Sequence, residues 1–448
     1  MARIFYGWFI VLAAFLNFFF AVSIFYYGFP VFYSSLIHSL GFTRAQVTQG
    51  FLIGSVVVGP LFGLFAGALI DRWGAPAVIR VGIGFVGISL VLMGTMTRLW
   101  HYYTLCIMLV LGYVLTGPIP NQVLISNWFR AKRGRAMGYV YLGAGLGGAV
   151  APPLENTLIE DFGWRHAFVI TGMVIPLALF PVAQLLTRST PGDLGLLPDG
   201  SAGDLSPSPI PSGSPANPHP LGTAERPVPN AYPRADASVS NAVRTANFWL
   251  LLAGSTLTIG AIGAVIQHLI LFLRDQGYTS GWASRLSSAL LLSSLAGRVI
   301  VGHFADRYSK KNVMALFYLW MGLCIPMLFL ARWPIAVWVF ALTFGFAMGA
   351  DYMLIPLVAV ECFGLKSLGK LLALIISGYS IAQWGAPWLA GKIFDSYHSY
   401  DPAWKIMSVS SLLGAATIYA ISSVPHSSKP APGEILRSDD RRLGKRAP

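Results

Sequence analysis

Apolar runs long enough to cross a lipid bilayer recur along almost the whole chain of 448 residues. A membrane-spanning helix needs about 20 consecutive apolar residues. The chain is 55% hydrophobic and only 11% charged, and runs of the required length occur at twelve places. Because a soluble protein of this length could not bury so much apolar surface, the sequence predicts an all-α protein embedded in a bilayer.

The predicted spans form two sets of six, separated by a segment of different composition. The spans are expected near residues 8–37, 45–70, 76–97, 101–127, 135–157, 164–187, 246–273, 282–304, 312–331, 335–360, 368–391 and 403–424. The segment between the sets is rich in proline, serine and glycine and has too few large apolar residues to fold alone. The predicted domains are an N-terminal half at 1–188, a disordered linker at 189–245, a C-terminal half at 246–425 and a basic tail at 426–448.

Basic residues gather in short turns on one side of the predicted membrane. They follow the fourth, eighth and tenth spans and recur in the tail, at Arg130, Lys132, Arg133, Arg135, Arg307, Lys310, Lys311, Lys366, Lys370, Arg437, Arg441, Arg442, Lys445 and Arg446. The opposite side carries scattered single cations. This positive-inside pattern predicts a multi-pass protein of the cell membrane whose N-terminus, linker and C-terminus are cytoplasmic. It also explains the net charge of +13 without binding of nucleic acid.

Neither the cysteines nor the glutamates of the spans indicate a metal site or an enzyme centre. Cys106, Cys324 and Cys362 lie in or beside apolar runs and lack metal-ligand spacing. Glu155 and Glu361 fall near span ends and are interpreted as interfacial. Because the sequence also contains no nucleophile–base set or phosphate-binding loop, we expect no cofactor, no metal and no enzyme activity.

One arginine lies deep in the eighth span. Arg298 precedes Asp306, in the charged turn, by eight residues, which places it about 12 Å inside the span at 1.5 Å per residue. Even a lenient insertion scale gives a cost of roughly 3 kcal/mol for arginine at depth, so a functional role is expected. Arg298 is the candidate binding site for an anion. The structural alternative is a side chain that extends to the near interface or pairs with a buried carboxylate.

Other polar side chains of the spans are candidates for the same site. Asn121 follows Pro118 and Pro120, which remove backbone hydrogen bonds and loosen the fourth span, so it either donates to substrate or packs at a kink. His268, in the outer half of the seventh span, is a candidate for binding substrate or a proton, or a satisfied interfacial histidine. Asp351 is the candidate for proton coupling, or else a fixed ion-pair partner of Arg298. Further candidates for substrate contacts are Tyr27, Tyr352, Tyr379 and Gln383.

A charged turn repeats at matching positions in the two halves. Residues 67–74 follow the second span, and residues 302–307 follow the eighth, which is the second span of its half. Two homologous six-helix halves are typical of an alternating-access transporter whose site lies between them near the midplane.

With these turns and the six-plus-six layout, the chain resembles the major facilitator superfamily outside the linker and the tail. The resemblance implies twelve transmembrane helices in two six-helix halves. It also implies a set of residues that gate the cytoplasmic side: Gly67, Asp71, Arg72, Gly74, Gly302, Asp306 and Arg307. Because Ala75 and Pro76 replace the usual basic pair in the first turn, a weaker contact is expected there.

Further motifs resemble the monocarboxylate transporter branch and its oxalate:formate antiporter relatives. They are Tyr6–Trp8, Gly28–Phe32, Gly41–Ala45, Trp128–Phe129, Gly163–Arg165 and Gly297–Arg298. In that branch the arginine of the eighth helix is implied to bind the substrate carboxylate, and Arg298 matches its position. Tyr26 or a neighbour replaces the deep lysine of animal members, and Ser294 replaces their aspartate, so their proton relay does not carry over intact.

We therefore expect a secondary active transporter of small monocarboxylates, such as lactate or pyruvate, coupled to protons and working by alternating access in the bilayer. An antiporter of oxalate, formate or another carboxylate is the alternative within transport. Oxalate carriers use a second cation in the eleventh helix, but no Lys or Arg lies between Leu371 and Leu389, and one interior arginine suits a monoanion better. A membrane sensor that binds without transport is the alternative of another class.

Overall fold

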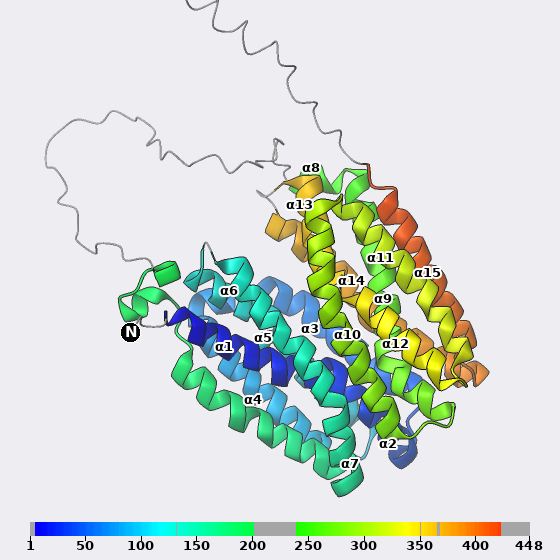
Figure 1. Cartoon of the computed structure of the whole chain (residues 1–448). Helices are drawn as coiled ribbons and strands as arrows, with labels where there is room; N and C mark the ends of the chain where they lie inside the picture. The colour runs from blue at the N-terminus through cyan, green and yellow to red at the C-terminus, as the bar shows by residue number, and fades with distance from the viewer. Residues whose placement is uncertain (1–4, 131, 201–238, 350, 365–367, 423–448) are drawn as a thin grey trace, which may run out of the picture.

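The structure is a computed structural model that describes residues 5–130, 132–200, 239–349, 351–364 and 368–422. For residues 60–68, 71, 200, 302, 306 and 352 it describes only the backbone. The described chain consists of helices and their connections, arranged in two groups that correspond to the two halves of the sequence (Figure 1). The prediction of an all-α protein is thereby confirmed.

The described residues of the N-terminal half form six helical passes. The first is assembled from α1 (Gly7–Asn17), the π-helical η1 (Phe18–Val22) and η2 (Ile24–Gly28), the 3-10 helix η3 (Phe29–Phe32) and α2 (Tyr33–Leu40). The others are α3 (Arg44–Trp73), α4 (Ala75–Met93), the pair α5 (Leu99–Thr116) and α6 (Pro118–Trp128), and α7 (Arg133–Leu186), which provides two passes.

The C-terminal half repeats this plan with different interruptions. Its passes are α9 (Ala246–Asp275), α10 (Ser280–Arg307), α11 (Lys310–Cys324) with the 3-10 helix η6 (Ile325–Leu330), α12 (Pro334–Met348) with α13 (Asp351–Phe363), α14 (Leu368–Tyr397) and α15 (Asp401–Tyr419). The described residues between the halves form three short helices: η4 (Pro191–Leu194), η5 (Pro198–Gly200) and α8 (Val239–Val243). Residues 201–238, in the predicted linker, lie outside the described chain, as do residues 423–448, which include the predicted tail.

The outer surface of the helices suits a lipid environment. Eight helical stretches of the described chain are long and apolar enough to cross a membrane. One of them, Arg133–Leu186, has 54 residues, and two crossings of about 20 residues each fit within it. Large apolar side chains are exposed on the outside, among them Leu177 at 77% and Ile335 at 78%. Such exposure would be costly in water and is expected where lipid covers the surface.

Local sequence signals explain where several helices begin and end. At the start of α3, the Thr43 hydroxyl accepts a hydrogen bond from the Gln46 backbone N–H at 3.2 Å, and the Gln46 side chain accepts one from the Thr43 N–H at 2.9 Å. This reciprocal pair is a capping box. Gly74 (φ 79°) separates α3 from α4, and Gly163 (φ 77°, ψ 156°) divides α7 into its two passes. Both glycines adopt a backbone conformation that side chains with a Cβ avoid.

The two halves meet at one end of the molecule and diverge toward the other. We call the end where α1 begins the near end, and the end where α2 terminates the far end. Between the halves, α3 packs against α14 and α7 packs against α10. Figure 1 shows the helices converging toward the far end, around α2, while α6 and α13 lie apart toward the near end. The described contacts therefore hold the halves together mainly at the far end.

Candidate functional site

Arg298 extends from the C-terminal half to the N-terminal half. Its Nη1 atom donates a hydrogen bond to the backbone carbonyl of Tyr141 on α7 at 3.1 Å, and its side chain also interacts with the Tyr27 hydroxyl. The preceding residue lets α10 lie close to α12, because a Cβ on Gly297 would come within 2.0 Å of the carbonyl oxygen of Phe346. The half-buried guanidinium thus lies where the halves face each other.

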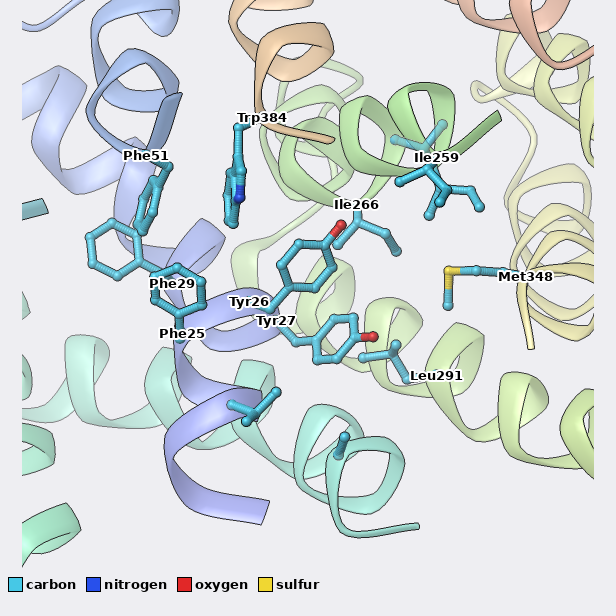
Figure 2. Close-up of a cluster of buried hydrophobic side chains, with 14 of the residues drawn as sticks. Phe25, Tyr26, Tyr27, Phe29, Phe51, Ile259, Ile266, Leu291, Met348 and Trp384 are labelled. Carbon is cyan, nitrogen blue, oxygen red and sulfur yellow. The ribbon is translucent and has the colours of Figure 1, made fainter. Parts of the chain in front are cut away.

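A set of five tyrosines, which we call the tyrosine cluster, surrounds this position. Its members come from η2, α5, α7 and α14: Tyr26, Tyr27, Tyr113, Tyr141 and Tyr379. Figure 2 shows the rings of Tyr26 and Tyr27 between Trp384, Ile266 and Leu291, so that apolar side chains of both halves cover them. The arrangement combines apolar walls with hydroxyl groups and one guanidinium, which suits a small organic anion.

Helix α7 positions Tyr141 through both its backbone and its ring. The Tyr141 hydroxyl accepts a hydrogen bond from Gln122 Nε2 of α6 at 2.7 Å, while its backbone carbonyl is bonded to Arg298. Tyr379 on α14 is an electrostatic neighbour of both Tyr141 and Asp351. Gln383, one turn further along α14, interacts with Tyr26. The predicted residues Tyr27, Tyr379 and Gln383 therefore lie with Arg298 in one region.

Asp351 opens α13 and is fully buried. Tyr318 of α11 donates a hydrogen bond from its hydroxyl to Asp351 Oδ1 at 2.6 Å. Asp351 Oδ2 has no hydrogen-bond partner among the described residues. Across those residues one ion pair occurs, between Arg44 and Asp275, so Asp351 is not paired with Arg298. A buried carboxyl group with an unused oxygen has room for a proton or a further donor.

Asn121 is fully buried, and its side chain satisfies backbone carbonyls at the break between α5 and α6. Its Nδ2 donates to the carbonyls of Thr116 at 2.7 Å and Gly117 at 2.8 Å, and its Oδ1 accepts from Asn17 at 3.4 Å. Pro120 has no N–H to offer the Thr116 carbonyl, and Asn121 provides the missing donor. Its amide is thus engaged within the N-terminal half, and a role in binding substrate stays a prediction.

His268 lies at the far end rather than in the tyrosine cluster. Its Nε2 lies 2.8 Å from the Pro387 carbonyl, and its Nδ1 lies 2.8 Å from the Tyr400 hydroxyl. A carbonyl only accepts, so Nε2 carries a hydrogen, and Nδ1 of the neutral ring accepts from Tyr400. Both ring nitrogens therefore have partners, as in the predicted alternative of a satisfied histidine, and a role in binding substrate or a proton stays a prediction.

The predicted gating residues are described in part. Gly74 forms the junction of α3 and α4, where an added Cβ would lie 2.9 Å from Ser189 Oγ. Arg72 and Arg307 lie exposed at the near ends of α3 and α10. The predicted roles of Gly67, Asp71, Gly302 and Asp306, and of Tyr352 in the substrate site, fall on residues whose side chains lie outside the described part.

One interpretation of the sequence is wrong. Glu155 is not interfacial: it is fully buried in α7, where the Thr171 hydroxyl lies 3.0 Å from both carboxylate oxygens. Tyr113, Tyr141 and Tyr318 were not predicted as residues of the site. One signal for Tyr141 was present, since it lies eight residues into α7, a depth similar to that of Arg298 from the end of α10.

Comparisons with known proteins identify the family of the chain. The model of the Major Facilitator Superfamily matches residues 10–297 and 279–442. Human monocarboxylate transporter 12 is 24% identical over 352 residues, covering 76% of this chain and 66% of its own length. The probable transporter MCH2 of Saccharomyces cerevisiae is 27% identical over 367 residues, covering 81% of this chain and 70% of its own length.

Solved structures show the same fold at lower identity. A bacterial homologue of the human lysosomal transporter Spinster, in an inward-facing and occupied conformation, superposes with a TM-score of 0.62 at 15% identity, covering 95% of this chain and 98% of its own. The unoccupied form gives a TM-score of 0.59 at 16% identity, covering 94% and 95%. Together with the family match, this shows that the chain is a multi-pass membrane protein of the major facilitator superfamily, similar in sequence to monocarboxylate transporters.

Proposed function

We propose that the protein is a secondary active transporter of small monocarboxylates such as lactate or pyruvate, coupled to protons. The observation that carries the proposal is the bond between Arg298 and the Tyr141 carbonyl, which connects the two halves at depth. A guanidinium binds a carboxylate through two parallel hydrogen bonds, a stronger arrangement than one bond to a neutral carbonyl. A substrate carboxylate would therefore replace the Tyr141 carbonyl on Arg298.

The surroundings of Arg298 support a monoanion with a short apolar body. The tyrosine rings provide apolar walls and hydroxyls, and Arg298 has no ion-pair partner among the described residues. A bound carboxylate would neutralise the single guanidinium, whereas a second carboxylate would need a further cation. Apolar faces around the substrate body would favour lactate or pyruvate over more polar acids.

Asp351 is the proposed proton carrier. Its Oδ2 is unused among the described residues, and Tyr318 holds Oδ1. Tyr379 is an electrostatic neighbour of Asp351 and also of Tyr141, whose carbonyl binds Arg298. Protonation of Asp351 would change the field at the substrate site, so proton binding and anion binding would be linked.

The proposed membrane orientation puts the near end in the cytoplasm. The basic turns, at Arg130, at residues 132–135 and at residues 307–311, lie at that end. With the halves joined at the far end, this conformation would open toward the cytoplasm. Alternating access would then require the far-end contacts to break and the halves to close at the near end.

Uptake of labelled lactate into proteoliposomes tests the proposal. Purified wild-type protein should show saturable uptake that an inward proton gradient stimulates. Arg298→Ala should reduce uptake at least 100-fold, because the loss of a buried charge-assisted contact is worth about 3 kcal/mol or more. Arg298→Lys should retain partial activity, because lysine keeps the charge but lacks the planar fork.

A thermal unfolding measurement serves as the control for folding. Equal unfolding temperatures of wild type and Arg298→Ala would assign the lost uptake to binding. Normal uptake by Arg298→Ala would contradict the proposed site. Exchange of external anion against oxalate or formate loaded inside the vesicles, without net lactate uptake, would identify an antiporter. Saturable binding without any flux would identify a sensor.

A further inference from the structure

Arg44, at the start of α3, joins the two halves at the far end. Its guanidinium makes a bidentate ion pair with Asp275 at the end of α9, with N···O distances of 2.6 and 2.7 Å. Nη1 also donates to the Tyr400 hydroxyl at 2.8 Å, and the guanidinium lies 3.6 Å from the ring centroid of Phe394. Arg44 belongs to the N-terminal half, and these three partners belong to the C-terminal half.

The backbone around Arg44 continues the same contact. Asp395 of α14 accepts hydrogen bonds from the N–H groups of Arg44 at 3.0 Å and Ala45 at 2.9 Å, and so caps the first turn of α3. A Cβ on Gly391 would approach the Arg44 carbonyl carbon to 2.7 Å, so α14 fits against α3 here only with glycine. We call Arg44, Asp275, Phe394, Asp395 and Tyr400 the far-end cluster.

A pocket of about 170 Å³ lies directly against the ion pair. Ser34, His38, Arg44, Arg274 and Asp275 line it together with two apolar residues. Arg274 donates a hydrogen bond to Ser34, which fixes one wall by joining α9 to α2. Two arginines and one carboxylate line this pocket, so the lining carries an excess of positive charge.

The two partners of the ion pair differ in exposure. The side chain of Arg44 is 13% exposed and that of Asp275 is 32% exposed. Asp275 is therefore the partner that can leave for water, while Arg44 stays stacked on Phe394. An external carboxylate in the pocket offers Arg44 the same bidentate geometry that Asp275 provides, and Arg274 lies in the same pocket as a second cation.

We propose that this pocket is a binding site for a small carboxylate, which displaces Asp275 from Arg44 and thereby weakens the contact between the halves at the far end, where Phe394, Asp395 and Tyr400 are the remaining partners. The site is separate from Arg298 and rests on the proposed function for the identity of its ligand. Arriving substrate would itself open the side from which it arrives. When the pocket is empty, Asp275 returns to Arg44 and the far end closes.

Distances between two spin labels across the far end test this proposal. Nitroxides are attached at Thr97, which is exposed between α4 and α5, and at Ser396, which is exposed on α14. The sample is the full-length protein in lipid nanodiscs, with Cys362 replaced by serine. Arg298→Ala serves as the background, so that lactate bound at the central site does not contribute. The distance distribution is recorded in buffer, in sodium lactate, and in sodium chloride of equal concentration.

We expect lactate to increase at least threefold the population of molecules in which the two labels lie farther apart, which we call the longer distance. Sodium chloride should leave the distribution unchanged. Asp275→Asn should populate the longer distance without lactate, because the amide no longer pairs with Arg44. Asp161→Asn, which removes an exposed carboxylate at the same end, is the matched control and should behave as the background.

Two results would overturn the proposal. An unchanged distance distribution in lactate would exclude ligand-driven release, and an equal response to chloride would reduce the effect to ionic screening. Lactate uptake by the wild type, measured separately, reports on the proposed function. Uptake without a distance change would reject the far-end site alone, and a distance change without uptake would reject the transport of lactate while leaving the site intact.

Discussion

Arg298 and Arg44 both join the halves of the molecule, but their environments differ. Arg44 has an ion pair, a hydroxyl acceptor and an aromatic ring as partners, whereas Arg298 contacts a backbone carbonyl and a tyrosine hydroxyl. A guanidinium with neutral partners gains more from an incoming carboxylate than one that already has a carboxylate. This difference assigns the stronger central binding site to Arg298 and an exchangeable contact to Arg44.

Asn121 provides a test at the scale of one residue. Asn121→Ala removes the donor for the buried carbonyls of Thr116 and Gly117, and an unsatisfied buried group costs about 1–3 kcal/mol. We expect a lower unfolding temperature with little change in the lactate KM. Asn127→Ala is the control, because it removes one exposed hydrogen bond from the same helix. A raised KM at unchanged unfolding temperature would instead support direct contact with substrate.

The sequence identifies charged residues that are costly to bury inside a membrane span, but it does not identify the groups that they contact. An arginine or aspartate inside an apolar run stands out, and Arg298 and Asp351 were found in this way. The partner of Arg298 is a backbone carbonyl, which every residue carries, so no pattern marks Tyr141. The Arg44–Asp275 pair joins residues 231 positions apart, and its geometry depends on how the halves pack.

At the scale of helices, interruptions determine where polar groups face. The break after Gly117 was expected from the two prolines, and it follows from their missing N–H groups. The π-helical turns of η1 and η2 were not expected, because no local residue type specifies a π turn. They arise where η1 and η2 pack against α7, and they carry Tyr26 and Tyr27 into the tyrosine cluster.

Gly163 allows a prediction for one helix. Gly163→Ala should lower the free energy of unfolding by about 1–3 kcal/mol, because φ 77° and ψ 156° are a strained backbone conformation for alanine. The added Cβ would meet no atom within 4 Å, so the cost comes from the backbone and not from a clash. Gly138→Ala in the same helix also meets open space but has helical backbone geometry. It should leave stability unchanged or raise it by about 0.5–1 kcal/mol. Equal destabilisation by both substitutions would contradict this assignment of strain.

At the scale of the whole molecule, membrane orientation follows from the distribution of cations. Green fluorescent protein fused after Pro448 should fluoresce in a bacterial host, and alkaline phosphatase fused there should be inactive, because a cytoplasmic C-terminus is predicted. Phosphatase fused after Thr97, in the far-end loop, should be active. The reverse pattern would invert the orientation and assign the pocket beside Arg44 to the cytoplasmic side.

The wide turns of the first pass have a consequence for changes in chain length. A π turn contains one residue more than an α turn, so η1 and η2 hold surplus residues in their turns. Deleting one residue between Phe18 and Ser23 would let that turn relax to α geometry with little loss of helix. The same deletion in α4 would rotate all following side chains by about 100° relative to their packing partners. The first pass is therefore the segment of this half in which a single-residue deletion is best absorbed.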